Sequence, residues 1–136
     1  MNEPLRIGIA GLGTVGASVA RILKSKSNSL THRCGRPIEV TGVTARDRTK
    51  DRGVDLAGIE WFDTPEALAA SSDIDVFVEL VGGDSGAALD SIRTALRSGH
   101  HVVTANKALL AKHGVELALL AEEKGLILNY EAAVAG

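Results

Sequence analysis

Three glycines near the start of the chain have the spacing of a phosphate-binding loop. Gly11, Gly13 and Gly16 form the pattern G-x-G-x-x-G, between a short apolar run and a helical pattern. The first glycine permits a tight turn, the second lets a pyrophosphate approach the backbone, and the third lets the helix pack closely on the strand. The alternative is a tight turn without a ligand. The dinucleotide site predicted at the helix start comprises Gly11, Leu12, Gly13, Thr14, Val15 and Gly16.

Basic side chains follow the second predicted strand, where a dinucleotide-binding domain meets the adenosine ribose. An Asp or Glu at this point would bind the 2′-hydroxyl group of NAD. The sequence instead has Ala45 followed directly by Arg46, with Lys50 close behind. A guanidinium can hold a 2′-phosphate through paired hydrogen bonds, so Arg46 and Lys50 favour NADP over NAD. The alternatives are a solvated basic loop, or an NAD site in which Asp47 reaches the ribose.

Two further groups are predicted at the same edge of the sheet, after later strands. Gly82 and Gly83 would let the nicotinamide half of the cofactor lie against the backbone, unless they form an ordinary turn. Asn106 can cap the helix that follows it. Lys107 stands in the first helical turn, where the helix dipole disfavours a positive charge. Its ammonium group could instead contact a cofactor ribose or a substrate carboxylate, or transfer a proton.

Six predicted strands, separated by helices, must position these residues. The strands are expected at 5–10, 38–45, 59–62, 75–83, 100–105 and 126–132. One helix is expected from Thr14 to a frayed end near 32–37, and one begins at Pro65 behind a Thr64 cap. Two more cover 87–99 and 106–125, the latter with a candidate break at Gly114. This alternation predicts an α/β fold of the Rossmann type, a doubly wound parallel sheet with helices on both faces.

The composition limits the classes of protein to which the chain can belong. Its 136 residues suit one domain over 1–136, with 45% hydrophobic residues, 24% charged residues and a formal net charge of −2. That charge argues against a nucleic-acid partner, and no apolar run approaches the ~20 residues that a membrane span needs. The N-terminus has no signal-peptide pattern, and the single cysteine, Cys34, fits a cytoplasmic location.

Five segments spread along the chain carry a family resemblance. They read GLGTVG, RPIEVTGVTARD, VFVELVGG, HHVVTANKALLAKHG and YEAAVAG, in this order. Together they resemble the N-terminal NAD(P)-binding domain of homoserine dehydrogenase over nearly the whole chain. The resemblance implies an oxidoreductase that interconverts L-homoserine and L-aspartate 4-semialdehyde with NADP(H) or NAD(H). That reaction is a step in the biosynthesis of threonine and methionine.

The resemblance also implies roles for particular residues. Arg46 would meet the 2′-phosphate of NADP, and Lys107 would be a catalytic lysine beside the nicotinamide ribose and the reacting substrate. A monovalent cation such as sodium would be held by Glu131 with backbone oxygens of Val134 and Gly136. Without the resemblance, Glu131 is only a carboxylate at the end of a strand.

Two features depart from the family pattern. The segment GGDSGAA stands where the family usually has a turn that contains proline. The family's chain also continues after YEAAVAG into a second domain, which supplies the dimer contacts, most substrate contacts and a second catalytic lysine. We therefore expect a chain truncated before its C-terminal catalytic and dimerisation domain. Such a fragment would bind the cofactor weakly without turnover, while the full enzyme would be a homodimer.

Other functions are compatible with the same motifs. One is a stand-alone NADP(H)-sensing module that signals through a partner, and another is a different small-substrate dehydrogenase similar to aspartate dehydrogenase. An aldehyde dehydrogenase that acts through a covalent thioester is disfavoured, because it needs a cysteine near the nicotinamide. Cys34 lies between the first helix and the second strand, at the opposite side of the predicted domain.

Overall fold

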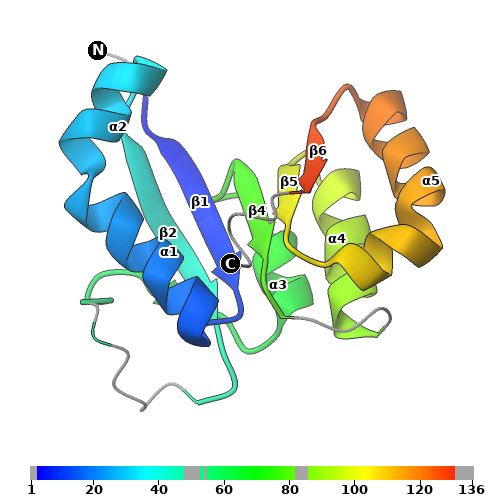
Figure 1. Ribbon diagram of the computed structural model, residues 1–136, viewed down its shortest axis with the longest axis horizontal. Coiled ribbons are helices and arrows are strands. Elements are labelled where there is room, and N and C mark those ends of the chain that lie inside the picture. The colour runs from blue at the N-terminus through cyan, green and yellow to red at the C-terminus, as the bar shows by residue number, and fades with distance from the viewer. Residues whose placement is uncertain (1–2, 48–52, 54, 82–85, 131–136) are drawn as a thin grey trace.

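The computed structural model describes residues 3–47, 53, 55–81 and 86–130, which form a parallel sheet with helices on both faces (Figure 1). The strands are β1 (Leu5–Ala10), β2 (Ile38–Thr44), β3 (Glu60–Trp61), β4 (Val76–Glu79), β5 (His101–Thr104) and β6 (Leu128–Tyr130). The helices are α1 (Thr14–Ser25), α2 (Ser27–Cys34), α3 (Pro65–Ala69), α4 (Ala87–Arg97) and α5 (Lys107–Lys124). The predicted Rossmann-type α/β fold is confirmed.

The strand order determines where a ligand can bind. It is β3-β2-β1-β4-β5-β6, and every pair of neighbours is parallel. The chain builds outward from β1 through β2 to β3, and then returns to add β4, β5 and β6 on the other side of β1. The order therefore reverses between β1 and β4. In open parallel sheets, ligands bind outside the carboxyl ends of the strands at such a reversal.

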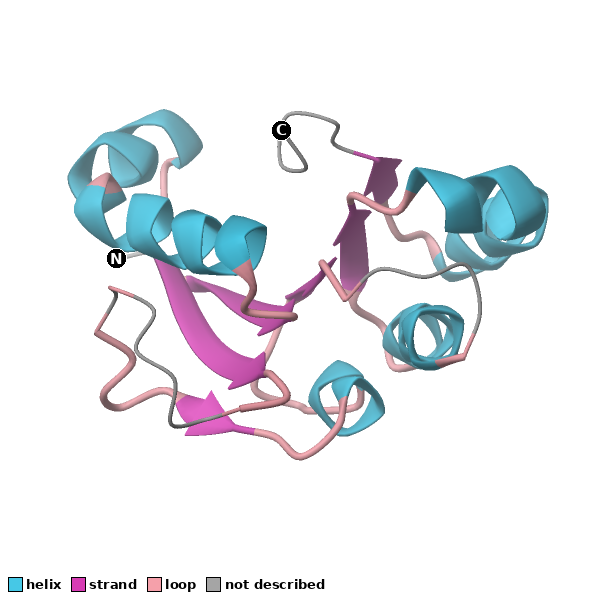
Figure 2. Cartoon of the chain, turned by 60° about the horizontal axis from the view of Figure 1, so that its bottom comes forward, coloured by secondary structure: helices cyan, strands magenta, loops and turns pink. Residues whose placement is uncertain are grey.

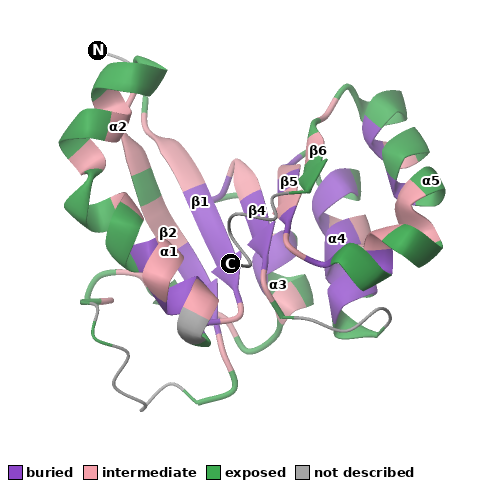
Figure 3. Cartoon of the chain, viewed as in Figure 1, coloured by how far each residue is buried: buried purple, intermediate pink, exposed green. Residues whose placement is uncertain are grey.

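Alternate residues of the central strands point to opposite faces of the sheet and build two cores. On one face, Ile9 of β1 and Val78 of β4 pack with Ala20 of α1. On the other face, Phe77 of β4 and Val102 of β5 pack with apolar residues of α3, α4 and α5. Figure 2 shows the two helical layers, and Figure 3 shows that buried residues gather on the sheet and on the inward faces of the helices. Both faces of the central strands are therefore covered, as a parallel sheet requires.

Several helix ends follow the predicted capping signals. The Thr64 hydroxyl oxygen accepts a hydrogen bond from the N–H group of Ala67, 3.1 Å away, and Pro65 begins α3. The Asn106 side-chain oxygen likewise accepts from the N–H group of Leu109, at 3.0 Å. Gly125, with a φ angle of +68°, ends α5 in the left-handed conformation that glycine tolerates best.

Two expectations about the helices are wrong. The first helix is divided at Lys26 into α1 and α2, and α2 has no buried residue that would hold it in line with α1. Ser and Asn around the division favour local hydrogen bonds and helix ends over a continuous helix. In contrast, α5 runs through Gly114 without a break. The cost of one glycine is about 1 kcal/mol, which the packing of this long helix exceeds.

Other boundaries differ by a few residues. The strand expected at 75–83 ends at Glu79, and the strand expected at 126–132 covers Leu128–Tyr130, with part of each prediction outside the described residues. Cys34, expected in a connection, is the exposed last residue of α2. None of the helices in the described part of the chain is long and apolar enough to cross a membrane.

Candidate functional site

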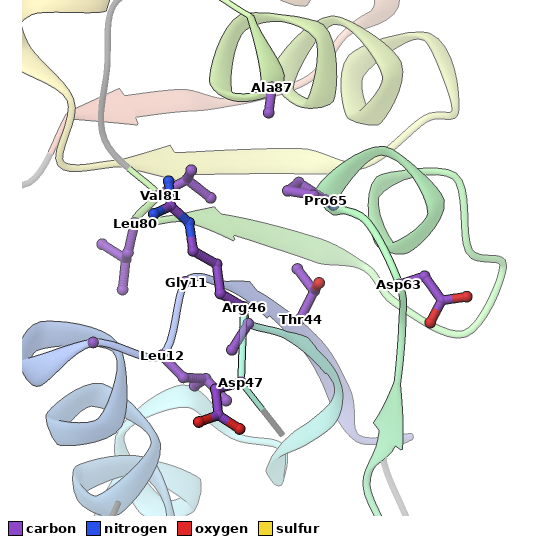
Figure 4. A pocket seen from close by; sticks show the side chains of 12 residues that line it. Gly11, Leu12, Thr44, Arg46, Asp47, Asp63, Pro65, Leu80, Val81 and Ala87 are labelled. Carbon is purple, nitrogen blue, oxygen red and sulfur yellow. The ribbon is translucent and has the colours of Figure 1, made fainter. Parts of the chain in front are cut away.

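A pocket of about 600 Å³ opens at the carboxyl ends of β1, β2 and β4, where the strand order reverses (Figure 4). Its walls come from the loops after these strands, the loop before α3 and the start of α4. The residues that line it are Gly11, Leu12, Gly13, Thr44, Ala45, Arg46, Asp47, Asp63, Pro65, Leu80, Val81 and Ala87. Its volume is within the range of small-molecule and cofactor sites.

Two of the three loop glycines are required by the protein itself. Gly11 has a φ angle of +98°, and a Cβ atom there would lie 2.7 Å from the backbone carbon and oxygen of Leu80. A Cβ atom on Gly16 would overlap the carbonyl oxygen of Gly11. Gly11 thus lets β1 pass close to the end of β4, and Gly16 lets α1 pack against the loop that precedes it. Val15 and Gly16 do not line the pocket.

Gly13 is different, because no atom of the described residues explains its glycine. Its φ angle of −69° and ψ angle of −160° are open to other residues, and nothing in the described part of the chain lies within 4 Å of a Cβ atom built there. It lines the pocket directly before α1, and as a glycine it has no side chain with which to cap the helix. The empty space beside Gly13 and the positive end of α1 therefore form a cradle that an anionic group would fit.

Arg46 and Asp47 form the side of the pocket that follows β2. Both side chains are exposed. In Figure 4 the Arg46 side chain extends across the pocket toward Val81, while the Asp47 carboxylate points away from it, on the side of Leu12. The guanidinium is therefore available to an anionic group that enters the pocket. Lys50, expected to assist Arg46, lies outside the described residues.

The wall after β4 is formed by Leu80 and Val81. The N–H group of Leu80 donates to the carbonyl oxygen of Ala10 at 2.8 Å, which fixes this wall to the end of β1. Gly82 and Gly83, which were predicted to contact the nicotinamide half of a cofactor, lie outside the described residues. Val81, a partly exposed apolar residue, is the last described residue on this side.

Lys107 is the exposed first residue of α5, directly after the buried cap Asn106. It follows β5 at the same carboxyl edge, as predicted, but it does not line the pocket described above. The structure therefore brings the glycine loop and Arg46 together around one cavity and places Lys107 beside the neighbouring strand end.

Sequence reasoning missed two buried polar residues between the pocket and Lys107. Glu79, the last residue of β4, and Thr104, the last residue of β5, are both 0% exposed. Their side chains are joined by a hydrogen bond of 2.6 Å. A carboxylate inside the apolar run VFVELV was the available signal for Glu79. Asp63 and Pro65, which also line the pocket, lacked any such signal.

The cation site predicted at Glu131, Val134 and Gly136 lies outside the described residues. Within the described ranges, no group of three or more His, Cys, Asp or Glu side chains is arranged to hold a metal ion.

Comparisons with known proteins identify the family that the chain resembles. A family model described as the NAD-binding domain of homoserine dehydrogenase matches residues 11–131. The homoserine dehydrogenase of Pseudomonas aeruginosa is 43% identical over 136 residues, which cover 98% of this chain and 30% of that protein. This chain thus spans about 30% of the length of the curated relatives that it resembles.

Solved structures give the same result. A homoserine dehydrogenase from Thiobacillus denitrificans superposes with a TM-score of 0.87 and 36% identity, over 96% of this chain and 30% of that one. The S. aureus homoserine dehydrogenase at pH 7.0 superposes with a TM-score of 0.86 and 33% identity, over 97% of this chain and 33% of that one. The chain therefore belongs to the family of the NAD-binding domain of homoserine dehydrogenase.

Proposed function

We propose that this chain is the NADP(H)-binding part of an enzyme that interconverts L-homoserine and L-aspartate 4-semialdehyde. The observation that supports cofactor binding most directly is the open space beside Gly13. A glycine whose backbone angles and surroundings do not require it, at the start of a helix and in a pocket wall, leaves room for a group from outside the chain. The pyrophosphate of a dinucleotide carries the charge that suits the positive end of α1.

The preference for NADP over NAD rests on Arg46. A planar guanidinium can form paired hydrogen bonds with a 2′-phosphate, and this side chain extends across the pocket (Figure 4). Ala45, in the position before it, offers no carboxylate to a 2′-hydroxyl group. The Asp47 carboxylate, directed away from Arg46, is the group that would serve NAD instead.

Lys107 is the proposed catalytic residue. The nicotinamide supplies hydride transfer to and from the hydroxyl-bearing carbon of homoserine when the cofactor is bound. At that carbon, the ammonium of Lys107 would donate a proton to the substrate oxygen when the aldehyde is reduced, and its neutral amine would take that proton back when the hydroxyl group is oxidised. This role is supported by the exposure of Lys107 at the carboxyl edge, three residues after Thr104, the last residue of β5.

The remaining proposals concern the longer protein. A monovalent cation such as sodium would be held by Glu131 with backbone oxygens of Val134 and Gly136. The catalytic and dimerisation contacts would come from a C-terminal domain, so that the chain studied alone binds cofactor and does not oxidise homoserine. The full enzyme would then act on its small-molecule substrate as a cytoplasmic homodimer. This chain covers about 30% of the relatives' length, which is consistent with a second domain that supplies those contacts.

Calorimetric titration with NADPH tests the proposed function. We expect the unaltered chain to bind one NADPH, and Gly13→Ala to bind at least about tenfold more weakly, because the added methyl group occupies the cradle. The matched control is Gly114→Ala, since Gly114 also has no contact closer than 3.9 Å at its Cβ position but lies on α5, away from the pocket. Absence of binding by the unaltered chain, or equal binding by Gly13→Ala, would contradict the proposal.

A further inference from the structure

Glu79 is a carboxylate buried in the sheet, and its position needs a physical explanation. It ends β4, is 0% exposed, and follows the apolar residues Val76, Phe77 and Val78. Burying a carboxylate is costly unless hydrogen bonds replace the lost water. An apolar residue at this position would avoid that cost, so the contacts that Glu79 makes indicate what it contributes.

The two oxygens of Glu79 connect two neighbouring strand ends. Oε2 accepts a hydrogen bond from the backbone N–H group of Val81 at 2.8 Å. Oε1 accepts from the hydroxyl group of Thr104, at the end of β5, at 2.6 Å. Both distances lie in the range of well-formed hydrogen bonds. Glu79 therefore holds the residue that follows β4 against the end of β5.

The connection continues from Thr104 to the start of α5. The Thr104 oxygen accepts from the backbone N–H group of Asn106 at 3.0 Å. The Asn106 side chain then accepts from the N–H group of Leu109 at 3.0 Å, which caps α5. A chain of hydrogen bonds thus runs from Val81, in the pocket wall, to the helix on which Lys107 is the first residue.

We propose that Glu79 and Thr104, here called the Glu79–Thr104 clamp, are positioning residues. The clamp fixes the Val81 wall of the pocket relative to Lys107, and so determines how tightly the nicotinamide half of the cofactor is held. This inference rests on the proposed function, because it assumes that NADP(H) occupies the pocket. Tight binding of the cofactor would then need the Glu79–Thr104 clamp in addition to the glycine loop and Arg46.

The clamp lies on one side of the site only. Its members belong to β4, β5 and the loops after them, whereas Arg46 follows β2 on the other side of β1. The adenosine end of the cofactor is expected beside Arg46, and the nicotinamide end beside the clamp. Loss of the clamp should therefore weaken binding of the complete cofactor without affecting binding of its adenosine part.

Two probes and three variants test this separation. The probes are NADPH and adenosine 2′,5′-bisphosphate, which lacks the nicotinamide half. Thr104→Val removes the hydroxyl group but keeps the shape, and Thr104→Ser keeps the hydroxyl group. Ser91→Ala is the control for loss of a buried hydroxyl group, because the Ser91 hydroxyl, also 0% exposed, donates to the carbonyl oxygen of Ala88 within α4. The thermal midpoint of each variant is measured beside its affinity.

Thr104→Val loses two hydrogen bonds, the one that Thr104 donates to Glu79 and the one that it accepts from the N–H group of Asn106. We expect this variant to bind NADPH at least about fivefold more weakly, and to bind the bisphosphate as the unaltered chain does. Thr104→Ser should restore NADPH affinity, and Ser91→Ala should leave both affinities unchanged even if its thermal midpoint falls equally. If Thr104→Val does not fold, Glu79→Gln provides the same comparison, because its amide cannot accept both hydrogen bonds. The same selective loss of NADPH affinity is then expected.

The outcomes distinguish failure of the clamp proposal from failure of the proposed function. Unchanged NADPH affinity in Thr104→Val, or an equal loss for both probes, would overturn the clamp while NADPH binding by the unaltered chain still supports the cofactor site. If the unaltered chain binds neither probe, the proposed function is contradicted, and the clamp with it.

Discussion

Gly16 in the first turn of α1 lies so close to the carbonyl oxygen of Gly11 that a Cβ atom on Gly16 would occupy the same space. Gly13, between them in the sequence, faces open space inside the pocket wall. The loop thus contains a glycine that packing requires and a glycine that packing does not require. This difference separates the part of the motif that stabilises the fold from the part that we assign to the cofactor.

Gly16→Ala should destabilise the folded chain. The added methyl group must push α1 away from the loop, and a strain of this kind costs about 2–3 kcal/mol or more in the free energy of unfolding. Gly114→Ala, in α5, should instead gain up to about 1 kcal/mol, because alanine is the better helix former. Urea denaturation of both variants measures the difference. Equal stability of Gly16→Ala and the unaltered chain would show that the loop relaxes around the methyl group.

Arg46→Ala should change the choice of cofactor. We expect NADPH binding to weaken at least about tenfold through loss of the paired hydrogen bonds to the 2′-phosphate, with NADH binding changed less than about twofold. Arg33→Ala removes the same charge from the exposed last turn of α2 and serves as the control. An equal loss for both cofactors in Arg46→Ala would assign Arg46 to general attraction of phosphate, and not to selection of NADP.

His100 should make the chain less stable below neutral pH. Burial lowers the pKa of its imidazole below the usual 6.5, although a hydrogen bond from Nε2 to the carbonyl oxygen of Ser71, 2.7 Å away, opposes the shift. The folded state therefore binds fewer protons than the unfolded state in this range. The contribution of neutral His100 to the free energy of unfolding is complete above about pH 6.5. It falls as the pH decreases from there through the lowered pKa of the folded state.

Urea denaturation at pH 7.5 and pH 5.5 measures this effect. His100→Gln should show a smaller loss of stability between the two pH values than the unaltered chain. His32→Gln, which changes an exposed histidine of α2, should leave the loss as it was. An identical loss in His100→Gln would assign the pH dependence to other groups.

Asp75→Asn should weaken the amino edge of the sheet. The Arg6 side chain donates to both carboxylate oxygens of Asp75, at 3.2 and 3.1 Å, and the Arg6 backbone N–H group donates to the same carboxylate at 2.9 Å. The Arg6 side chain is the largest cause of the lowered pKa of Asp75. The ion pair between Arg6 and Asp75 therefore stabilises the folded chain above about pH 4. This stabilisation disappears as the pH falls through the lowered pKa of Asp75.

The measurement is the thermal midpoint of Asp75→Asn relative to the unaltered chain. We expect a lower midpoint for the variant at pH 7, and a difference that shrinks as the medium becomes acidic enough to protonate Asp75. A difference that is the same at all pH values would mean that the ion pair contributes nothing beyond the shape of the side chain.

The parts of the fold that were predicted correctly have local signals. The strand before Gly11 and the helix after it follow from an apolar run, three glycines and a helical stripe that are adjacent in the sequence. The cap of α3 follows in the same way from Thr64 and Pro65, because the donor that Thr64 satisfies belongs to Ala67, three residues later. The left-handed end of α5 follows from Gly125.

The parts that were missed depend on contacts between distant segments. Glu79 and Thr104 are 25 residues apart and meet only because β4 and β5 pair, so neither residue reveals the other in the sequence. Gly114 has the propensity of a helix breaker, yet α5 packs on the sheet along one face and continues through it. The low helix propensity of glycine predicts a break at Gly114, but helix propensity does not include the packing that keeps α5 continuous.

The backbone amide signals of a ¹⁵N-labelled sample would show where NADPH binds on the folded chain. We expect shifts at Gly11, Gly13, Arg46 and Val81, around the carboxyl-edge pocket, and little change at Asp75 and His100 on the amino edge. Shifts that gather at the amino edge, or no shifts at saturating NADPH, would contradict the assignment of this pocket to the cofactor.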